Sequence, residues 1–409
     1  MTASVHVVSV GVGPFAAGDT EGGAVVAALA SAGVPVAARV FIEEDDAALE
    51  HSLASDGGLT VIVAGAGGSA GDIVRRAIAR AAGVRLALSE RMLAALEEFY
   101  QHRDRPLPRR AERLALLPQG AVLCPMAGGE PAWILDTARA AFVVLPRGAH
   151  AGIEALIEQQ VLPLARARLS RGAVMVRTLK TADASVSDVE DRLVDFLARD
   201  GDVSLLVVPA EAEVWVRLRA RGATPAEASD GLAAAEAEVL AVLGDDCYGR
   251  DADTLERVVG TRLRARGLTL AVAESCTGGL LGHRLTSVAG SSAYFERGVI
   301  VYSNDAKMEL LGVPESVLRA HGAVSGPAAE AMARGVCAMA RTPCGLSITG
   351  IAGPEGGTPA KPVGTVFIGL AFDGEATARR FLFSGDRNAI KWQSSSMALD
   401  MLRRRLGGD

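Results

Sequence analysis

The sequence predicts an α/β protein with two parallel-sheet domains and a small α+β module between them. A length of 409 residues corresponds to two or three domains, since a typical domain has roughly 150 residues. The composition, with 49 % hydrophobic and 22 % charged residues, is typical of a globular chain that buries large cores. Apolar runs alternate with helical patterns toward both ends of the chain, and this alternation is typical of parallel sheets.

The first predicted domain comprises residues 1–168 and is expected to be a parallel-sheet domain. Apolar strand patterns occur in four places, at residues 6–13, 34–42, 59–67 and 140–148. A helical pattern with alanine and valine on one face follows the first strand and ends at Gly33. Parallel sheets bind ligands beyond the carboxyl ends of their strands, so the loops after Val10 and Val63 are candidate binding sites. The basic residues 101–113 predict an exposed loop.

The second predicted domain, residues 169–250, has the order strand, helix, strand, strand, helix. Strand patterns occur at 174–180, 203–210 and 213–222, and helical patterns at 187–199 and 224–244. We expect a small α+β module here, with residues 244–251 as a linker to the next domain.

The third predicted domain, residues 251–409, is again of the α/β type. Asp253 is expected to cap a helix that ends at Gly267. Strand patterns follow at 268–273, 297–303, 344–350 and 363–372. A helix after Asp386 closes the chain.

Charge and cysteine content narrow the functional classes. The net charge is −6, which disfavours sequence-independent binding to DNA or to a membrane surface. The five cysteines include no C-x-x-C pair, so neither a zinc ribbon nor a disulfide framework is indicated. No apolar run reaches the roughly 18–20 residues of a membrane helix. We expect a cytoplasmic protein without nucleic-acid or membrane partners.

The clearest chemical motif lies in residues 268–285, where an apolar strand runs through Ser275 and Thr277 into a helix. A hydroxyl at such a turn stands beside free backbone N–H groups and a positive helix end, which suits an anion or an oxyanion. Gly278 and Gly279 let a ligand approach the backbone closely. The alternative is that Ser275 or Thr277 only caps the helix.

A second motif, residues 297–312, has a strand that ends at Tyr302 and a helix that Asn304 is expected to cap. Lys307 lies in the first turn, where the helix dipole disfavours a cation. Burial there would lower its pKa, and a neutral lysine accepts a proton from a serine hydroxyl. The alternative is a solvated surface lysine.

A third motif, residues 346–371, is a glycine-rich loop between two strands, and its N–H groups suit a phosphate. Gly350 and Gly353 belong to this loop, and Arg387 beyond it could add a phosphate contact. An ordinary connection and an exposed arginine are the alternatives.

The nucleophile has two candidates, Ser275 and Cys276, because neighbouring side chains point in different directions and only one should face the site. No histidine occurs in the three motifs, since His283 lies further along the following helix and His321 lies in a loop. A Ser-Lys pair therefore fits better than a Ser-His-Asp triad.

The motifs AESCTGG, VYSNDAKMELLGV, HGAVS, TGIAGPEGGTPAKPVGTVFIGLA and GDR occur in this order between residues 250 and 409. This part of the chain resembles the C-terminal domain of the CinA family, the nicotinamide-nucleotide amidohydrolase domain. The resemblance implies hydrolysis of nicotinamide mononucleotide to nicotinate mononucleotide and ammonia, without a metal or other cofactor. It implies Ser275 as the nucleophile, with Tyr302 and Lys307 as its catalytic helpers.

In this interpretation Ser275 attacks the amide carbon, and Lys307 accepts the hydroxyl proton and returns it to ammonia, with Tyr302 as a relay or orienter. Backbone N–H groups near Thr277 stabilise the oxyanion, and residues 349–357 with Arg387 hold ribose and phosphate. The expected substrate-binding residues are Thr277, Gly278, Gly279, Asn304, Thr349, Gly350, Gly353 and Arg387.

Residues 1–250 resemble the rest of a full-length CinA protein, a molybdopterin-binding-like domain followed by a small module. Relatives use a divalent metal in the first domain to split ADP-ribose, but the GGxGPTxDD motif is degraded here at residues 64–72. One of its two aspartates is a glycine, so that only Asp72 remains, and its Pro-Thr pair is Gly-Ser. The flanking motifs are also altered, at residues 11–13 and 146–149. A metal is expected only if this pyrophosphatase is retained. Three functions remain open: the amidohydrolase, a bifunctional hydrolase, and a non-enzymatic competence or damage scaffold. The resemblance also implies a homodimer.

Overall fold

A computed structural model describes most of the chain. The described residues are 5–11, 19–43, 45–53, 58–64, 68–107, 111–124, 130–147, 152–168, 173–210 and 212–407. The chain divides into two compact units, Met1–Val176 with Ala220–Asp230 and Arg177–Arg219 with Gly231–Asp409. Among the described residues, no helix has both the length and the apolar character needed to cross a bilayer.

The N-terminal sheet has six strands in the order β2-β1-β3-β8-β7-β6. These strands are β1 (Val5–Val10), β2 (Val36–Ile42), β3 (Leu59–Val63), β6 (Val122–Cys124), β7 (Ala132–Asp136) and β8 (Ala141–Leu145). The first four strands in the sheet order are parallel, as expected, whereas β7 and β6 form an antiparallel edge that the sequence patterns did not predict.

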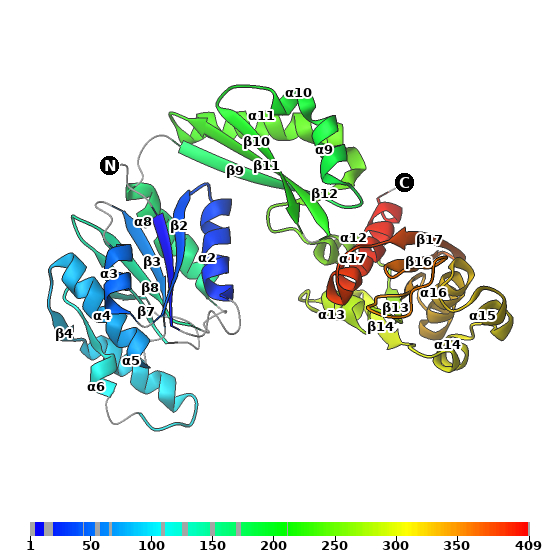
Figure 1. The fold of residues 1–409 in the computed structure, drawn as a ribbon, viewed down its shortest axis with the longest axis horizontal. Helices are drawn as coiled ribbons and strands as arrows, with labels where there is room; N and C mark the ends of the chain where they lie inside the picture. Colours follow the sequence, from blue (N-terminus) through cyan, green and yellow to red (C-terminus); the bar gives the residue numbers. More distant parts are fainter. Residues whose placement is uncertain are drawn as a thin grey trace. The chain divides into compact units, whose positions relative to one another are not determined.

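Helices cover both faces of this sheet. They are α2 (Thr20–Ser31), α3 (Asp46–Leu53), α4 (Gly68–Ala82), α5 (Glu90–Gln101), α6 (Ala111–Leu114), α7 (Ile153–Leu156) and α8 (Leu162–Arg168), with a π-helical turn at Ile157–Val161. A short hairpin pairs β4 (Leu86–Leu88) with β5 (Leu116–Pro118). Figure 1 shows α2 on one side of the sheet and α3 and α4 on the other. Val7 packs toward α2 and Val8 toward α4, as the two-residue period of a strand requires.

Two local predictions in this domain have different outcomes. Gly33 follows α2 with a φ of 76°, so the predicted helix end is confirmed. The predicted loop 101–113 is only partly correct, because α6 begins at Ala111.

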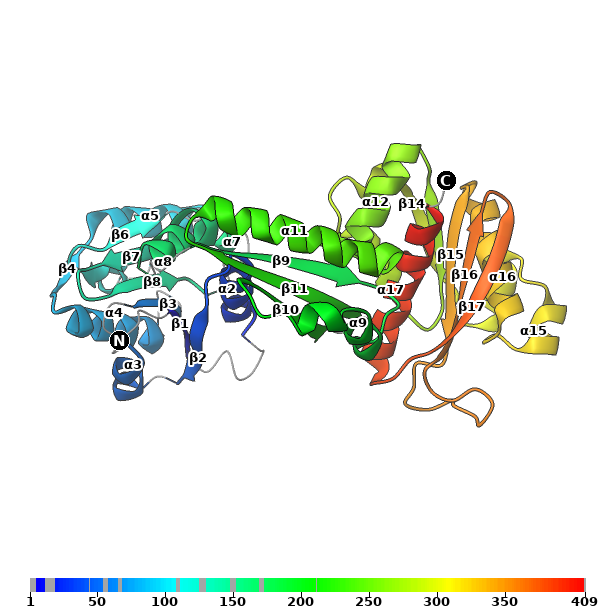
Figure 2. The same cartoon turned by 90° about the horizontal axis from the view of Figure 1, so that it is seen from above.

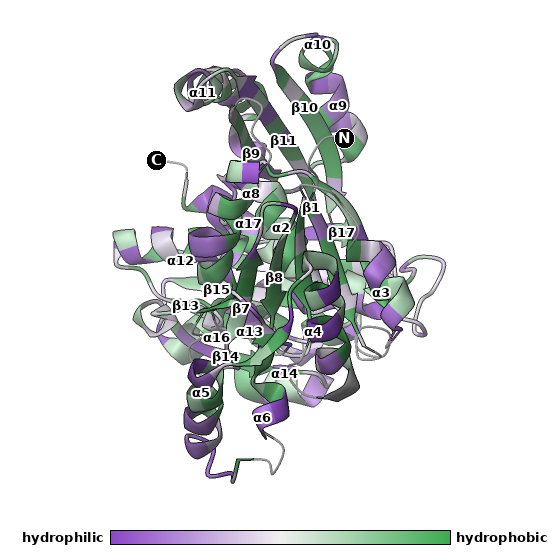
Figure 3. Cartoon of the chain, turned by 90° about the vertical axis from the view of Figure 1, so that its left-hand side faces the viewer, coloured by the Kyte–Doolittle hydropathy of each residue, from purple (hydrophilic) through white to green (hydrophobic). Residues whose placement is uncertain are grey.

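In Figure 3 the strand β8 is mostly green, and α5 carries purple turns. An amphipathic helix of this kind covers the sheet with one face and meets water with the other.

The middle sheet has the order β10-β11-β9-β12. Its elements are β9 (Ala173–Thr181), α9 (Val186–Arg192), α10 (Val194–Leu197), β10 (Val203–Ala210), β11 (Glu213–Gly222), α11 (Pro225–Leu243) and β12 (Cys247–Arg250). The prediction of a linker at 244–251 is wrong. Residues Gly244–Asp246 form a 3₁₀ turn, and β12 then pairs antiparallel with β9.

The C-terminal sheet has the order β14-β13-β15-β16-β17. Its strands are β13 (Leu270–Glu274), β14 (Phe295–Ile300), β15 (Cys344–Gly350), β16 (Thr365–Phe372) and β17 (Glu375–Leu382). The first three strands in this order run parallel, and β16 and β17 continue the sheet in antiparallel fashion.

Two helical layers enclose this sheet. The helices are α12 (Leu255–Arg266), α13 (Leu280–Thr286), α14 (Asn304–Leu311), α15 (Glu315–His321), α16 (Gly326–Ala340) and α17 (Arg387–Arg405). Figure 2 shows α12 and α17 on one side of β15, β16 and β17, and α15 and α16 on the other. Along β13, Leu270 and Val272 face the α12 and α17 layer, whereas Ala271 and Ala273 face α16.

The start of α12 corrects one prediction, and its end confirms another. Asp253 does not cap α12, because the side chain of Thr254 accepts the Arg257 N–H, while Asp253 accepts the N–H of Arg250. Gly267 ends the helix with a φ of 62°, as expected.

Candidate active site

The candidate active site lies at the carboxyl edge of the three parallel strands of the C-terminal sheet. β13 ends at Glu274 and continues into the turn 275–279, while β14 ends at Ile300 and β15 at Gly350. Parallel strands present their carboxyl ends at one edge of a sheet. Residues that are distant in the sequence therefore meet there.

The turn that carries Ser275 is held by backbone hydrogen bonds. The N–H of Ser275 donates to the carbonyl of Ile348 in β15 (2.9 Å), and the N–H of Gly278 donates to the carbonyl of Ser275 (3.2 Å). Gly278 and Gly279 have φ angles of 62° and 98°, which glycine adopts at little cost. The two glycines let the chain reverse between β13 and α13 and leave the buried Ser275 side chain at the bend.

Glu274 caps the N-terminus of α13, a role that the sequence motifs did not suggest. Its carboxylate accepts the N–H groups of Gly279 (3.0 Å), Leu281 (3.1 Å) and Gly282 (2.8 Å). The interpretation that Ser275 or another hydroxyl in the turn caps this helix is therefore wrong: the N-cap residue is Gly279, and it has no side chain to offer. The sequence feature that could have predicted this cap is an acidic residue just before a glycine-rich helix start, where a negative charge is favourable.

Lys307 in α14 is a buried lysine in contact with Ser275. Its side chain is 1 % exposed, and Nζ lies 3.2 Å from Ser275 Oγ. Nζ also donates to the carbonyl of Val301 (2.8 Å) and, over 3.4 Å, to the carbonyls of Tyr302 and Ser303. Burial lowers the pKa of the Lys307 amine, because a charged group loses its hydration there. The alternative of a solvated surface lysine is thus wrong.

This environment suits a neutral amine as well as an ammonium group. A neutral amine has two N–H bonds and one lone pair. The N–H bonds of Lys307 would be satisfied by the backbone carbonyls, of which that of Val301 is nearest. The lone pair would then face Ser275 Oγ and accept its proton. Geometry and pKa direction both agree with a general base at this position.

Cys276 has a different environment from its neighbour Ser275. Its side chain is buried in the hydrophobic cluster between the sheet and α17. Burial raises the pKa of its thiol to about 11, so the thiol stays protonated near neutral pH. Of the two adjacent candidates, Ser275 is the one in hydrogen-bond contact with Lys307.

Tyr302 and Arg387 meet outside the contact between Ser275 and Lys307. The Tyr302 side chain is 63 % exposed, and its hydroxyl accepts a hydrogen bond from Arg387 Nη2 (3.1 Å). Arg387 Nη1 donates to the carbonyl of Gly353 in the glycine-rich loop (2.6 Å). Only the backbone carbonyl of Tyr302 contacts Lys307. The structure thus brings Tyr302, Arg387 and Gly353 together, but it does not place the Tyr302 hydroxyl as a link between Ser275 and Lys307.

Three other predicted substrate-binding residues lie in a helix or a strand instead of a loop. Asn304 is the first residue of α14, and Ser303 is the cap, because its hydroxyl accepts the Ala306 N–H; the prediction that Asn304 caps this helix is wrong. Thr349 and Gly350 belong to β15 instead of the loop. The buried Thr349 hydroxyl donates to a backbone carbonyl, that of Ala323 (2.8 Å). A Cβ on Gly350 would lie 2.6 Å from the Val366 side chain, so close strand packing explains this glycine.

The backbone donors in the turn are only partly available. The Gly278 and Gly279 N–H groups, which were expected to face an oxyanion, are bound to Ser275 and Glu274. The N–H groups of Cys276 and Thr277 donate to no backbone carbonyl of the described residues, although the Cys276 N–H lies against its own thiol. Within the same part of the chain, the fully buried Thr277 hydroxyl also has no hydrogen-bond partner. Donors for an oxyanion therefore remain at Cys276 and Thr277.

Lys391 adds a second cation beside this turn. A Cβ placed on Gly278 would lie 3.9 Å from Lys391 Nζ. Lys391 lies four residues after Arg387 in α17, so both side chains leave the same face of the helix. A cation in the first turn of a helix opposes its dipole, so the reasoning that singled out Lys307 also indicates Arg387, the first residue of α17, but not Lys391 in the second turn.

The N-terminal domain does not offer Asp72 as a metal ligand. Arg75 and Arg113 both form ion pairs with its carboxylate. The described residues contain no group of three or more His, Cys, Asp or Glu side chains that would hold a metal. Residues 12, 13, 65–67, 148 and 149 of the altered motifs lie outside the described residues. Asp72 as it stands does not fit the role of holding a divalent ion.

Three family models match the chain in sequence. Residues 7–167 match a probable molybdopterin binding domain, residues 176–249 the KH domain of damage-inducible protein CinA, and residues 252–406 the CinA C-terminal domain.

Curated relatives match nearly the whole length. A CinA-like protein of Geobacter sulfurreducens is 38 % identical over 393 residues, which is 95 % of each chain. A putative competence-damage inducible protein of Moorella thermoacetica is 39 % identical over 383 residues, 92 % of each chain.

Solved structures resemble a part of the chain. A CinA superfamily protein from Klebsiella pneumoniae is 37 % identical and covers 37 % of this chain and 96 % of its own, with a TM-score of 0.37. A competence/damage inducible protein from Agrobacterium tumefaciens is 40 % identical, covers 38 % of this chain and 94 % of its own, and has the same TM-score, 0.37.

Proposed function

Because the chain belongs to the CinA family, we propose that its C-terminal domain is a nicotinamide-nucleotide amidohydrolase. The substrates are nicotinamide mononucleotide and water, and the products are nicotinate mononucleotide and ammonia. The observation that carries the proposal is the 3.2 Å contact between Lys307 Nζ and Ser275 Oγ, made by a buried lysine whose pKa is lowered. That pairing is an activated nucleophile with its base.

The first half of the reaction forms an acyl-enzyme. Ser275 Oγ attacks the carboxamide carbon while its proton passes to Lys307 Nζ. The N–H groups of Cys276 and Thr277 stabilise the negative charge on the carbonyl oxygen. The carbon–nitrogen bond breaks, and the proton on Lys307 moves to the nitrogen, which leaves as ammonia.

The second half repeats these steps with water. Lys307 accepts a proton from water, and the oxygen attacks the acyl carbon. The ester bond to Ser275 breaks, and the proton returns to Oγ. The product acid ionises to a carboxylate, so atoms and charges balance without a metal ion or another cofactor.

Tyr302 has an orienting role in this proposal, because its hydroxyl is held by Arg387 and does not reach Lys307. Arg387 also holds Gly353, so the pair joins the end of β14 to the glycine-rich loop. We place the ribose and phosphate of the substrate on this side of the site.

The test is ammonia release from nicotinamide mononucleotide by the full-length chain without added metal. Ser275→Ala should reduce the rate by about 10³-fold or more, as loss of a nucleophile does elsewhere. Ser287→Ala is the matched control, because Ser287 lies at the end of α13 and its hydroxyl only donates to the carbonyl of His283. Full activity in Ser275→Ala would contradict the assignment of the nucleophile.

The other two functions have less support. The ion pairs of Asp72 with two arginines count against the ADP-ribose pyrophosphatase, since a metal would have to displace them. Incubation of the full-length chain with ADP-ribose and several divalent metals tests it. A non-enzymatic scaffold would not need a buried lysine beside a serine. Its test is a partner protein whose binding survives Ser275→Ala.

A further inference from the structure

The turn beside Ser275 faces a cation that the proposed chemistry does not use. Lys391 is half-buried in α17, and its Nζ lies 3.9 Å from the position of a Cβ on Gly278. Lys391 makes no hydrogen bond or ion pair to any residue that the structure describes. An ammonium group that is partly removed from water and has no ion-pair partner favours the binding of an anion.

Arg387, one helical turn earlier, is already engaged. One terminal nitrogen of its guanidinium donates to the Gly353 carbonyl (2.6 Å) and the other to the Tyr302 hydroxyl (3.1 Å). It therefore holds the loop and the tyrosine in place, and its positive charge adds to that of Lys391 on the same face of α17. In the turn opposite Lys391, the Thr277 hydroxyl is fully buried and has no partner among the described residues.

We propose that Lys391 binds the phosphate of the substrate and makes the site select a nucleotide amide over the corresponding phosphate-free amide. This inference rests on the proposed function and refines it, because it assigns the anion to Lys391 with Arg387 as a positioning residue. Lysine binds phosphate as a point charge with three donors, which tolerates the geometry of a flexible ligand. The amide end of the ligand would then lie toward Ser275, on the other side of the turn.

Steady-state kinetics of the full-length chain test the proposal with two substrates, nicotinamide mononucleotide and nicotinamide riboside. Lys391→Met should lower the preference for the phosphorylated substrate about tenfold or more, mainly through a higher KM. Lys391→Arg should restore most of that preference, because it restores the charge.

Arg334→Met is the control for the loss of one positive charge from this domain. Arg334 lies on α16, is exposed and pairs only with Glu330. Its replacement should leave the ratio of the two kcat/KM values unchanged. If Lys391 had a purely structural role, Lys391→Met would lower kcat/KM for both substrates equally. The preference for the phosphorylated substrate would then be unchanged, and this result would overturn the proposal.

Binding measurements separate a failure of this inference from a failure of the proposed function. Calorimetry with full-length Ser275→Ala should show that adding Lys391→Met weakens binding of nicotinamide mononucleotide about tenfold. If the native chain releases no ammonia but this difference is found, the amidohydrolase is wrong and the anion site stands. If both variants bind the nucleotide equally, or if neither the nucleotide nor inorganic phosphate binds, the anion site is wrong.

Discussion

Lys307 shows how one residue acquires its chemistry from a specific environment. Its Nζ is surrounded by backbone carbonyls and by Ser275 Oγ, in a place that water scarcely reaches. The sequence indicated this lysine because a cation in the first turn of a helix is unfavourable. The sequence did not indicate the cap correctly, because Ser303 and Asn304 are both good N-cap residues. In the structure Ser303 takes the position.

The lowered pKa of Lys307 predicts a pH dependence of the reaction. Activity should rise with pH as Lys307 loses its proton, with a midpoint below the value of about 10.4 for a free lysine. Lys307→Met should lower kcat about 10²–10⁴-fold and abolish this ascending limb. The rate of ammonia release, measured between pH 5 and pH 10, checks the ascending limb and the fall in kcat. Lys180→Met in the middle module is the control, and this variant should retain the ascending limb. A limb that persists in Lys307→Met would assign the base to another group.

The same shift affects stability in a defined direction. Between the lowered pKa and that of a free lysine, the unfolded chain binds more protons at this position than the folded chain. The contribution of Lys307 to the free energy of unfolding therefore rises with pH through this window. Below the window the folded chain carries a buried charge, which is a cost to stability at the active site.

At the scale of elements, the site depends on the junction between β13 and α13. Glu274 accepts three N–H groups of the helix start, so the turn with Ser275 is held between a strand and a capped helix.

On the other face of the sheet, α16 also packs closely. A Cβ on Gly369 would lie 2.4 Å from the carbonyl oxygen of Ala329, so glycine in β16 lets α16 approach the sheet.

Glu274→Gln is predicted to weaken this junction. An amide offers one acceptor oxygen where the carboxylate offers two, so at least one buried N–H loses its partner. We expect a loss of about 1–3 kcal/mol in the free energy of unfolding and a fall in kcat, because Ser275 is no longer held in place. Urea unfolding and ammonia release measure the two effects.

Thr254→Ala is the control for a lost cap in the same domain. Thr254 caps α12 through the N–H of Arg257, away from Ser275. Its loss should cost about 1 kcal/mol of stability without a change in kcat. An equal effect of both substitutions on kcat would show that Glu274 has no special relation to the nucleophile.

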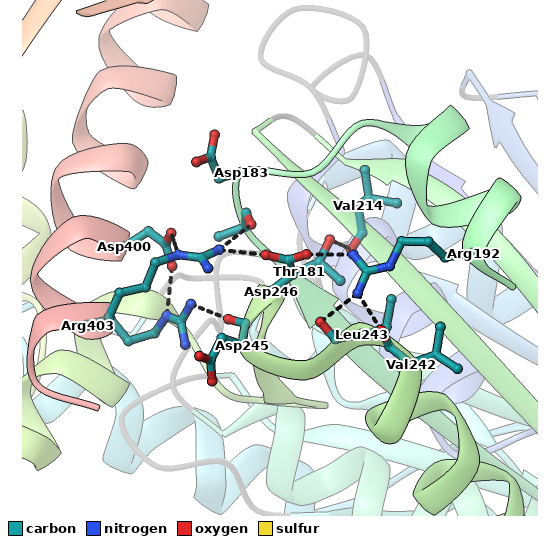
Figure 4. Close-up of polar contacts among 12 residues, drawn as sticks. Thr181, Asp183, Arg192, Val214, Val242, Leu243, Asp245, Asp246, Asp400 and Arg403 are labelled. Carbon is teal, nitrogen blue, oxygen red and sulfur yellow. Dashed lines mark hydrogen bonds and ion pairs between the residues drawn. The ribbon is translucent and has the colours of Figure 1, made fainter. Parts of the chain in front are cut away.

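At the scale of the molecule, the middle module is joined to the C-terminal helix α17 by charged side chains. Asp246 accepts hydrogen bonds from Arg192 (2.6 Å) and Arg404 (2.9 Å). Figure 4 shows Arg403 between Asp400 and the backbone of Asp245. Burial opposes ionisation of Asp246, but its hydrogen bonds to the two arginines outweigh burial and hold its pKa below the usual range.

Asp246→Asn should therefore lower the free energy of unfolding by about 1 kcal/mol at neutral pH. The contribution of Asp246 is present above the pKa of an unfolded aspartate, about 3.9, and is lost as the pH falls through its lower value in the folded chain. Denaturant unfolding at pH 7 and pH 3 checks this, and the difference between the two chains should shrink at pH 3. Asp183→Asn, at a more exposed pair with Arg379, is the control and should have a smaller effect.

The alternation of strands and helices and the glycines that end α2 and α12 could be predicted from the sequence, because they depend on residues close together in the chain. The ordered motifs also indicated the family. The sequence also indicated Ser275 and Lys307, each from its own strand or helix end. Only the tertiary structure brought Lys391 to the turn at Gly278 and placed two arginines on Asp72. Such contacts depend on how helices cross a sheet and on which strand ends meet, and no local pattern carries that information.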